Sequence, residues 1–351
     1  MENEGKYENL IDKSIGFEEF PNELLLKIFN FFEIVDLIKC SQTSKRIRDI
    51  CYDDSLWQKI NLSNKKVKTE FLQKVIDHGC KCLKLNEAKI IGTLRLKNKS
   101  QFTNLDLSGC TAVFRSVFEE LLKSCHFLQT LTFTQEVNLG VMSQLTVQNG
   151  KTLQILNYWQ GTQGRSLWNP TPLKLFTIEC IIKNCPELKE LTFWNGDKSS
   201  ETYGNRCCWH EGNDVEYLVN NISPEIEKLG FGMPIGPFSV GDRRLKILVT
   251  RCTKLKELRV MGVITNESLK HIIDNLKATL EKLVIPWCES NGLGLPMGNF
   301  SVGKMRELKS MTKLKTLDLM TYVAYVDETD ISELRIELPD VSVNWYDLEY
   351  F

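Results

Sequence analysis

Residues 185–193 read CPELKELTF, and residues 252–260 read CTKLKELRV. In both stretches a cysteine is followed, at the same spacing, by two leucines and a further apolar residue. Residues 125–133, CHFLQTLTF, follow the same pattern. Because side chains alternate along a strand, the second leucine and the apolar residue two positions later lie on one face. The pattern therefore predicts a short strand that recurs along the chain.

Weaker copies of this pattern occupy most of the sequence. They lack the cysteine but keep the apolar spacing, as in GKTLQILNY from Gly150 and KATLEKLVI from Lys277. Most of the shorter gaps between copies fall in the period of about 20–29 residues that is typical of leucine-rich repeats. The central apolar position of the copies falls at Ile60, Leu83, Leu105, Leu131, Leu156, Leu191, Leu229, Leu258, Leu283, Leu317 and Leu334.

The segments between the copies have helical spacing. Residues 111–125 place Val113, Val117 and Leu121 at intervals of three or four, and residues 265–276 repeat this spacing, with Thr265 as a plausible N-cap. A single strand–helix unit of this size cannot bury its apolar face, so the units must stack. The sequence therefore predicts an α/β fold, a right-handed solenoid shaped like a horseshoe, with parallel strands on the concave face and helices outside.

The chain contains 12 cysteines. Cys125, Cys185 and Cys252 recur at one position of the repeat, which indicates buried packing and not a metal site or a nucleophile. Cys207, Cys208 and His210 could lend ligands to a zinc ion, but the second ligand pair that zinc needs is absent nearby, and we expect no metal. The cysteine pattern, together with LDLSGC at residues 105–110, resembles the cysteine-containing leucine-rich repeats.

Residues 17–62 have a different character. Leu24, Leu25, Ile28, Phe29 and Phe32 form a broad apolar stripe at helical spacing. A second helix is predicted to begin with Asp36 as its N-cap, and a third to carry Ile47 and Ile50. Three short helices in about 45 residues bury too little surface to be stable alone. This unit therefore needs a partner surface or the neighbouring domain.

This segment contains, in order, the stretches Phe20-Pro21, Glu23-Leu24-Leu25-Leu26, Ile28-Phe29, Asp36-Leu37, Cys40-Ser41, Lys45-Arg46 and Ser55-Leu56-Trp57. In these stretches it closely resembles an F-box. The resemblance implies docking onto the S-phase kinase-associated adaptor protein, which links to the cullin scaffold and RING subunit of an SCF-type ubiquitin ligase. The residues expected to contact the adaptor are Phe20, Pro21, Leu24, Leu25, Ile28, Phe29, Phe32, Leu37 and Cys40.

An F-box followed by repeats resembles the F-box/leucine-rich-repeat family, whose repeats hold a substrate. We expect a flexible tail at residues 1–16, an F-box at 17–62 and the repeat domain at 63–351. Residues that follow the central leucines should face the concave wall. Interface anchors are often aromatic, Arg or Met, so the candidates for substrate contact are Trp159, Trp194, Arg259, Met261 and Trp287, unless the tryptophans pack under loops.

Two long insertions, residues 160–172 and 195–214, are rich in glycine, asparagine and serine. Insertions in repeat proteins become loops on one face, often the binding face, so we expect both to overhang the concave surface. The sequence does not reveal the protein substrate. The formal net charge of −1, the polar N-terminus and the lack of a long apolar run predict a protein of the cytoplasm or nucleus that binds neither nucleic acid nor membranes.

No HExxH or GxSxG motif is present, and we expect a non-catalytic protein without a cofactor. Two alternatives remain. The protein could be a scaffold that binds the adaptor without ubiquitylation, or a nucleotide hydrolase that uses GNFSVGKM at residues 298–305 as a P-loop, in which case Lys304→Ala would remove nucleotide binding. Met305 stands where a P-loop needs Ser or Thr, and a similar stretch at residues 232–242 has Asp242 in place of the lysine. We therefore interpret both stretches as connectors between a strand and a helix.

Overall fold

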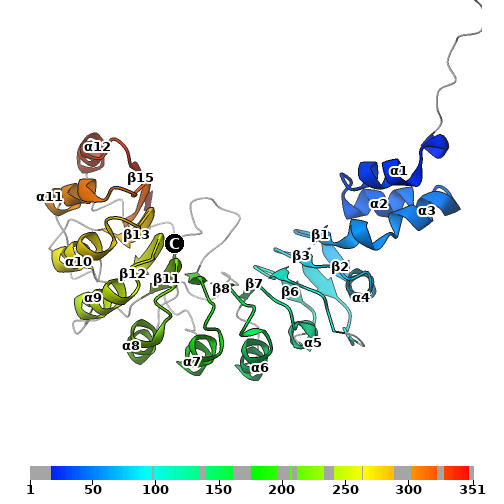
Figure 1. The fold of residues 1–351 in the computed structure, drawn as a ribbon, viewed down its shortest axis with the longest axis horizontal. Helices are drawn as coiled ribbons and strands as arrows, with labels where there is room; N and C mark the ends of the chain where they lie inside the picture. Colours follow the sequence, from blue (N-terminus) through cyan, green and yellow to red (C-terminus); the bar gives the residue numbers. More distant parts are fainter. Residues whose placement is uncertain are drawn as a thin grey trace, which may run out of the picture.

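A computed structural model of the chain describes residues 17–96, 99–114, 116–134, 139–160, 175–195, 206–207, 212–232, 241–262, 264–287, 302–321 and 328–347. A small helical domain lies at one end of a curved array of strands and helices (Figure 1). The strands line the inner, concave side of the array and the helices its outer side. The predicted architecture is therefore confirmed.

Three α-helices make up the N-terminal domain: α1 (Asn22–Phe29), α2 (Ile34–Cys40) and α3 (Lys45–Cys51), with 3-10 turns at Phe17–Glu19 and Asp54–Trp57. Pro21 precedes α1, and its carbonyl accepts hydrogen bonds from the backbone of Leu24 and Leu25. The N-cap of α2 is Glu33, so the prediction of Asp36 was wrong. Asp36 lies in the first turn instead, where its negative charge is favoured by the helix dipole, and it pairs with Lys39 at 3.0 Å.

In the described residues the main sheet has 12 strands, which run parallel in chain order apart from one short strand, β10, that pairs antiparallel with β9. Between successive strands, a segment of each repeat runs on the outer side of the array. The strands are β1 (Lys59–Asn61), β3 (Cys82–Lys84), β5 (Asn104–Asp106), β7 (Thr130–Thr134), β8 (Ile155–Gln160), β9 (Glu190–Asn195), β10 (Arg206–Cys207), β11 (Lys228–Gly232), β12 (Glu257–Met261), β13 (Lys282–Pro286), β14 (Thr316–Thr321) and β15 (Ser342–Asp347).

The predicted central leucines are aligned across the sheet. Each one pairs with the leucine of the next strand, from Ile60 opposite Leu83 to Leu283 opposite Leu317, and each is buried. The alignment continues to Val343 of β15, not to Leu334. Leu334 is a buried residue of helix α12 (Glu328–Glu337), because Ile331, Leu334 and Leu338 are spaced by three and four, as on a helix.

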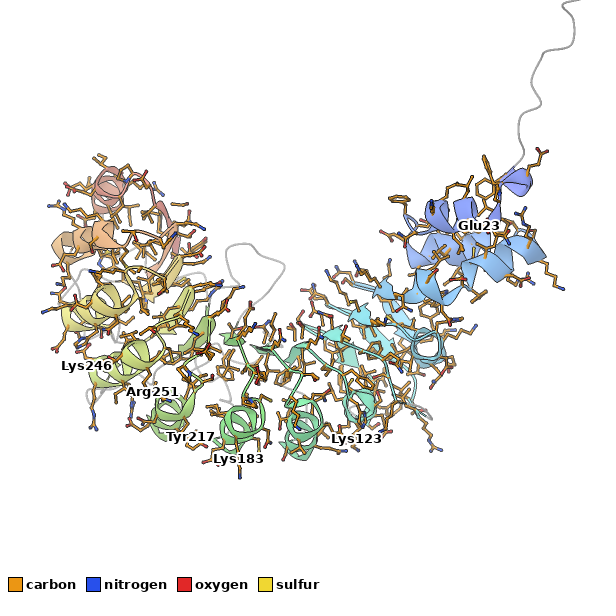
Figure 2. All side chains as sticks on the ribbon, in the orientation of Figure 1. Glu23, Lys123, Lys183, Tyr217, Lys246 and Arg251 are labelled. Atoms are coloured by element: carbon orange, nitrogen blue, oxygen red, sulfur yellow. The ribbon has the colours of Figure 1, made fainter. Side chains whose placement is uncertain are left out.

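The outer layer consists of helices, as the helical spacing of apolar residues between the repeat copies predicted. Thr265 caps α10 as predicted, since its hydroxyl accepts hydrogen bonds from the backbone of Glu267 and Ser268. Figure 2 shows labelled side chains such as Lys183 and Lys246 projecting outward from this layer. The helices are α4 (Thr69–Asp77), α5 (Ser116–Ser124), α6 (Leu139–Asn149), α7 (Leu175–Asn184), α8 (Gly212–Asn221), α9 (Gly241–Arg251), α10 (Asn266–Leu276), α11 (Val302–Met305), which a 3-10 turn at Arg306–Ser310 follows, and α12 (Glu328–Glu337).

The repeated cysteines are core residues. Cys125, Cys185 and Cys252 each follow directly after the last residue of a helix, and all three are buried, as predicted. Burial raises the pKa of Cys185 to about 12 and that of Cys125 and Cys252 to about 11. The thiols therefore stay protonated and pack as small apolar groups.

A second, three-stranded parallel sheet forms beside the main one in the first repeats, from β2 (Lys66–Lys68), β4 (Lys89–Ile91) and β6 (Thr111–Ala112). The turn that leads to it contains a residue with positive φ at the same place in each repeat: Asn64, Glu87 and Gly109. Gly109 suits this turn because a Cβ there would lie 2.8 Å from Cγ of Glu87. The predicted helix over residues 111–125 therefore begins only at Ser116, and Val113 lies outside it.

Trp57 joins the two domains. Its indole is buried, donates a hydrogen bond to the carbonyl of Cys51 at 2.9 Å, and stacks on His78 at 4.5 Å between ring centroids. Tyr52 stacks against both rings, and Nδ1 of His78 lies 2.7 Å from a carboxylate oxygen of Asp54. The last turn of the helical domain therefore shares one aromatic core with the end of α4, which holds the domain against the first repeat.

Candidate functional site

The helical domain exposes large apolar side chains on its surface. Leu24 of α1 is 43% exposed, and Phe31, in the turn after α1, is 87% exposed. Phe17, Phe32 and Val35 are exposed as well. These five residues are called the N-terminal apolar surface below. Several exposed large apolar residues in so small a domain are typical of a surface that a partner covers.

Three of the residues predicted to contact an adaptor are core residues. Leu25 and Phe29 are fully buried and Leu37 is 2% exposed. Leu25 and Phe29 are four residues apart on α1 and share its inner face, while Leu24, one residue earlier, lies outside that face. A side chain without accessible surface cannot touch a partner while the domain keeps this packing. We therefore remove these three residues from the proposed contact set.

The remaining predicted residues keep accessible surface. Pro21, Leu24 and Phe32 are exposed, and Phe20, Ile28 and Cys40 are half-buried. The sequence reasoning missed Phe31, the most exposed of the large apolar residues. It treated FNFF as a continuation of the helical stripe, but α1 ends at Phe29, so the helical period no longer predicts which of the following phenylalanines turns inward.

The concave face is the second candidate surface. Trp159 and Trp194 are in register on β8 and β9, and Met261 closes β12, but the side chains of these three residues lie outside the described part of the structure. Arg259 is described and pairs with Glu257 on its own strand. Residues 161–172 of the first insertion and most of the second, at 195–214, also lie outside the described residues, so their predicted position over this face stays a prediction.

Trp287 does not belong to the concave surface. It is fully buried, like Leu283 and Ile285. Trp287 lies four residues after Leu283, an even offset, and side-chain alternation therefore directs it toward the core, whereas the other candidates lie one or three residues after their leucines. The prediction of substrate contact for Trp287 was wrong for this reason. Val284, Asp318 and Met320, which the alternation assigns to the concave wall, are buried too.

The starts of the later strands carry an alternating charge pattern that the sequence reasoning missed. The two residues before the central leucines of β9, β11, β12 and β13 are Lys-Glu, Glu-Lys, Lys-Glu and Glu-Lys. The second residue of each pair begins the strand, and in register Lys228 is opposite Glu190 and Glu257, and Glu257 is opposite Lys282. Nζ of Lys228 lies 2.7 Å from Glu190, and Nζ of Lys256 lies 2.6 Å from Glu227. The charge ladder consists of Lys189, Glu190, Glu227, Lys228, Lys256, Glu257, Glu281, Lys282 and Lys315.

Electrostatics within the charge ladder are mutually supportive. The hydrogen bond and charge of Lys256 lower the pKa of Glu227, and those of Lys315 lower the pKa of Glu281. The pKa of Lys256 is raised in turn, chiefly by its hydrogen bond with Glu227. Opposite charges placed directly across neighbouring strands stabilise that strand order. Because the charges neutralise one another, this part of the surface has little net attraction for a strongly charged ligand.

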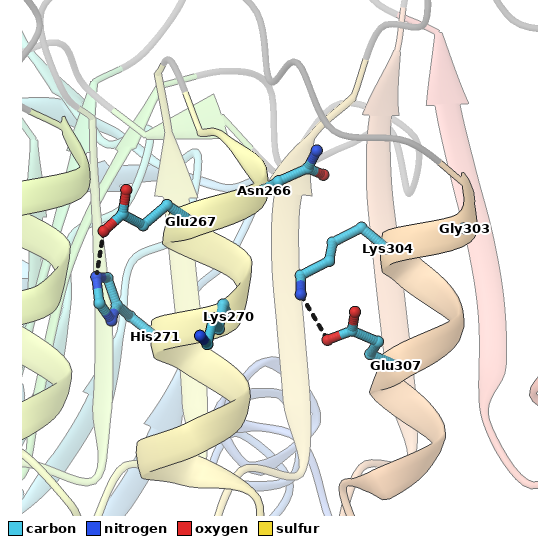
Figure 3. A pocket seen from close by; sticks show the side chains of 7 residues that line it. All are labelled: Asn266, Glu267, Lys270, His271, Gly303, Lys304 and Glu307. Carbon is cyan, nitrogen blue, oxygen red and sulfur yellow. Dashed lines mark hydrogen bonds and ion pairs between the residues drawn. The ribbon is translucent and has the colours of Figure 1, made fainter.

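The segment Gly303–Lys304 of the P-loop-like stretch lies in α11. These residues line an open cavity of ≈ 630 Å³ together with Asn266, Glu267, Lys270, His271 and Glu307. Figure 3 shows Lys304 directed at Glu307, to which its ammonium lies 2.6 Å away. Met305, at the position of the magnesium-binding hydroxyl of a P-loop, is fully buried. The arrangement is that of a helix packed on the core, and it gives the nucleotide-hydrolase alternative no support.

Among the residues that the structure describes, no group of three His, Cys, Asp or Glu side chains is placed to hold a metal ion. Cys207 lies in β10, opposite Trp194, while Cys208 and His210 lie outside the described residues. No helix in the described part of the chain is long and apolar enough to cross a membrane.

Comparison with known proteins gives two findings. Residues 17–63 match the model of the F-box-like family. The chain is also similar to the crystal structure of the leucine-rich repeat-containing protein LegL7 from Legionella pneumophila, with 9% sequence identity and a TM-score of 0.40 over 82% of this chain and 91% of that chain. The family match coincides with the helical domain, and the repeats stand on their own geometry, the aligned leucines and the alternation of parallel strands with helices.

This architecture, an F-box with leucine-rich repeats, is typical of substrate receptors of SCF ubiquitin ligases, which are usually non-catalytic. The N-terminal apolar surface lies within the F-box-like match and remains accessible. The chain thus consists of an F-box-like domain at residues 17–63 followed by a leucine-rich-repeat-like domain.

Proposed function

We propose that the protein is the substrate-recognition subunit of an SCF-type ubiquitin ligase. The F-box-like domain binds an S-phase kinase-associated adaptor protein, and the adaptor connects to the cullin scaffold and RING subunit. The repeats hold a protein substrate for ubiquitylation and degradation. In this proposal the protein supplies no reacting group. It holds a substrate lysine near a conjugating enzyme that carries ubiquitin, and this proximity accelerates the transfer of ubiquitin to the lysine.

The observation that carries this proposal is the N-terminal apolar surface within the F-box-like match. Phe31 presents most of its surface to solvent and Leu24 is exposed as well, although the same short domain has a closed core around Leu25 and Phe29. Burying exposed apolar side chains in a partner would release the free energy that their exposure costs. The half-buried Phe20, Ile28 and Cys40 and the exposed Pro21 and Phe32 complete the proposed contact set.

For the substrate we propose the concave face between β8 and β12. Trp159 and Trp194 are adjacent in register, and Arg259 and Met261 both belong to β12, two strands beyond β9 in the sheet. Substrate capture should therefore fail in a Trp159→Ala, Trp194→Ala variant while adaptor binding persists. Loss of both activities together would contradict this division of roles.

The test of the whole proposal is affinity purification of the full chain and of a Leu24→Asp, Phe31→Asp variant. We expect adaptor and cullin to copurify with the wild type and to be absent from the variant. The complex purified with the wild type should support ubiquitylation of a captured protein. Adaptor without cullin would favour the alternative of a scaffold that does not serve a ligase. Equal recovery of adaptor with both proteins would refute the proposed docking surface.

A further inference from the structure

Positive charge is concentrated in the first two repeats. Residues 59–96 contain nine Lys and Arg but three Asp and Glu, whereas the whole chain has a formal net charge of −1. The remainder of the chain is therefore acidic overall, and the basic segment is a local feature. Locally concentrated charge of one sign attracts a partner of the opposite sign.

The outward face of the three-stranded sheet carries part of this charge. Lys66 and Lys68 of β2 and Lys89 of β4 are exposed, while Val67 and Ile90, which alternate with them, are buried. Lys66 stands directly opposite Lys89. Like charges in that arrangement destabilise a strand pair, so the pairing of β2 with β4 is less stable in this respect than the pairing of strands in the later repeats, where opposite charges meet.

These lysines are free of the pairing seen in the charge ladder. Within the described residues, no carboxylate lies within the 4.0 Å of an ion pair from Lys66, Lys68 or Lys89. In the ladder, by contrast, Lys228 and Lys256 each meet a glutamate on the neighbouring strand. The difference leaves the charges of the three-stranded sheet available to a carboxylate from another molecule.

Exposed apolar side chains adjoin the same face. Ile91, opposite Lys68 in register, is 40% exposed, and Val113 and Phe114, directly after β6, are about half exposed. The backbone N–H of Val113 donates to the carbonyl of Ile90, which places Val113 beside β4. Lys66, Lys68, Lys89, Ile91, Val113 and Phe114 are called the basic–apolar face below.

We infer that the basic–apolar face binds an acidic, apolar-containing segment of a partner protein. The lysines would pair with Asp or Glu carboxylates, and the exposed Ile91, Val113 and Phe114 would be covered by apolar side chains of the same segment. A nucleic acid would satisfy the lysines but leave the aliphatic side chains without a matching surface, so the combination favours a protein. This inference does not depend on the proposed function, because none of these residues belongs to the F-box-like domain or to the concave face.

The test uses the full chain and a fluorescein-labelled peptide of alternating glutamate and leucine, followed by fluorescence anisotropy at increasing salt. We expect salt-dependent binding that a Lys66→Glu, Lys89→Glu variant weakens by about tenfold or more. A Val113→Ser, Phe114→Ser variant should weaken it in a manner independent of salt. The matched control is Lys183→Glu, Lys246→Glu, which reverses two exposed lysines on the outer helices and should leave binding unchanged.

Several outcomes would overturn the inference. These are failure of the wild type to bind the peptide, equal binding by the reversed variant, or equal weakening by the control pair. A duplex DNA or RNA that binds the face more tightly than the peptide, with no effect of the two serine substitutions, would assign the face to nucleic acid instead. Thermal unfolding of every variant checks the fold. Adaptor binding by the Lys66→Glu, Lys89→Glu variant should equal that of the wild type, which separates this test from that of the F-box-like domain.

Discussion

Phe31 and Phe29 make a paired test of the N-terminal apolar surface, because they are two residues apart and have opposite environments. Phe31 is 87% exposed, and Phe29 is fully buried. Full burial of a phenylalanine side chain releases about 1.5–3 kcal/mol. If the adaptor covers the exposed 87% of Phe31, Phe31→Ala should cost about 1.3–2.6 kcal/mol of binding free energy, or roughly a 10- to 80-fold rise in Kd.

Phe31→Ala should weaken adaptor binding with little change in stability, whereas Phe29→Ala should chiefly lower stability. Phe31→Ala removes few contacts within the chain, so its free energy of unfolding should stay within about 0.5 kcal/mol of the wild type. Phe29→Ala removes a buried ring that contacts Phe32 at 5.3 Å between centroids and should destabilise the protein by about 3–5 kcal/mol. Isothermal titration with purified adaptor measures the first effect, and chemical denaturation measures the second.

Ile336 provides a matched control for exposure. It is 77% exposed on α12, at the opposite end of the solenoid, so Ile336→Ala removes a comparable apolar surface without touching the F-box-like domain. Its Kd for the adaptor should equal that of the wild type. The reasoning is refuted if Phe31→Ala leaves Kd unchanged, or if Ile336→Ala weakens binding as much as Phe31→Ala does.

Three further predictions concern the repeats. Asn149→Leu should destabilise the solenoid by about 1–3 kcal/mol for each buried backbone group that it leaves unpaired. The side chain of Asn149 accepts a hydrogen bond from the N–H of Leu128 and donates one to the carbonyl of Cys125. Thermal unfolding measures the loss, and an unchanged Tm would contradict it. The Cys125 thiol, whose pKa burial raises to about 11, should resist maleimide at neutral pH until the chain unfolds, and mass spectrometry of native protein with Cys125 labelled would refute this. Glu227→Lys should lower stability at low salt, and Lys256→Glu in the same chain should restore it. Because the pKa of Glu227 is lowered in the folded state, the stability that this pair contributes should be complete above pH 4.5 and lost as the pH falls further. Denaturation at several pH values that shows no such loss would exclude this contribution.

The repeat register followed from local chemistry. A leucine or isoleucine at each central position can be buried only if neighbouring strands align at that position, since a slip of one residue would turn every leucine toward solvent. For this reason the spacing alone predicted the alignment from Ile60 to Leu317, and also the burial of Cys125, Cys185 and Cys252. The F-box-like segment was recognisable for a similar reason, because its apolar stripe and helix starts depend on neighbours in the sequence.

What the sequence alone determined was therefore the type of each repeating element and the side of it that is apolar. Only the tertiary structure decided which apolar residues are closed off and which stay accessible. The helical period could not separate Leu25 from Leu24 or place Phe31, because these positions depend on where α1 ends and how α3 packs. The charge ladder and the unpaired Lys66 and Lys89 arise in the same way, since a charge is matched or unmatched only once a strand from another repeat lies beside it. Contacts between strands about 20 to 40 residues apart define the charge ladder and the basic–apolar face, and such contacts exist only in the folded solenoid.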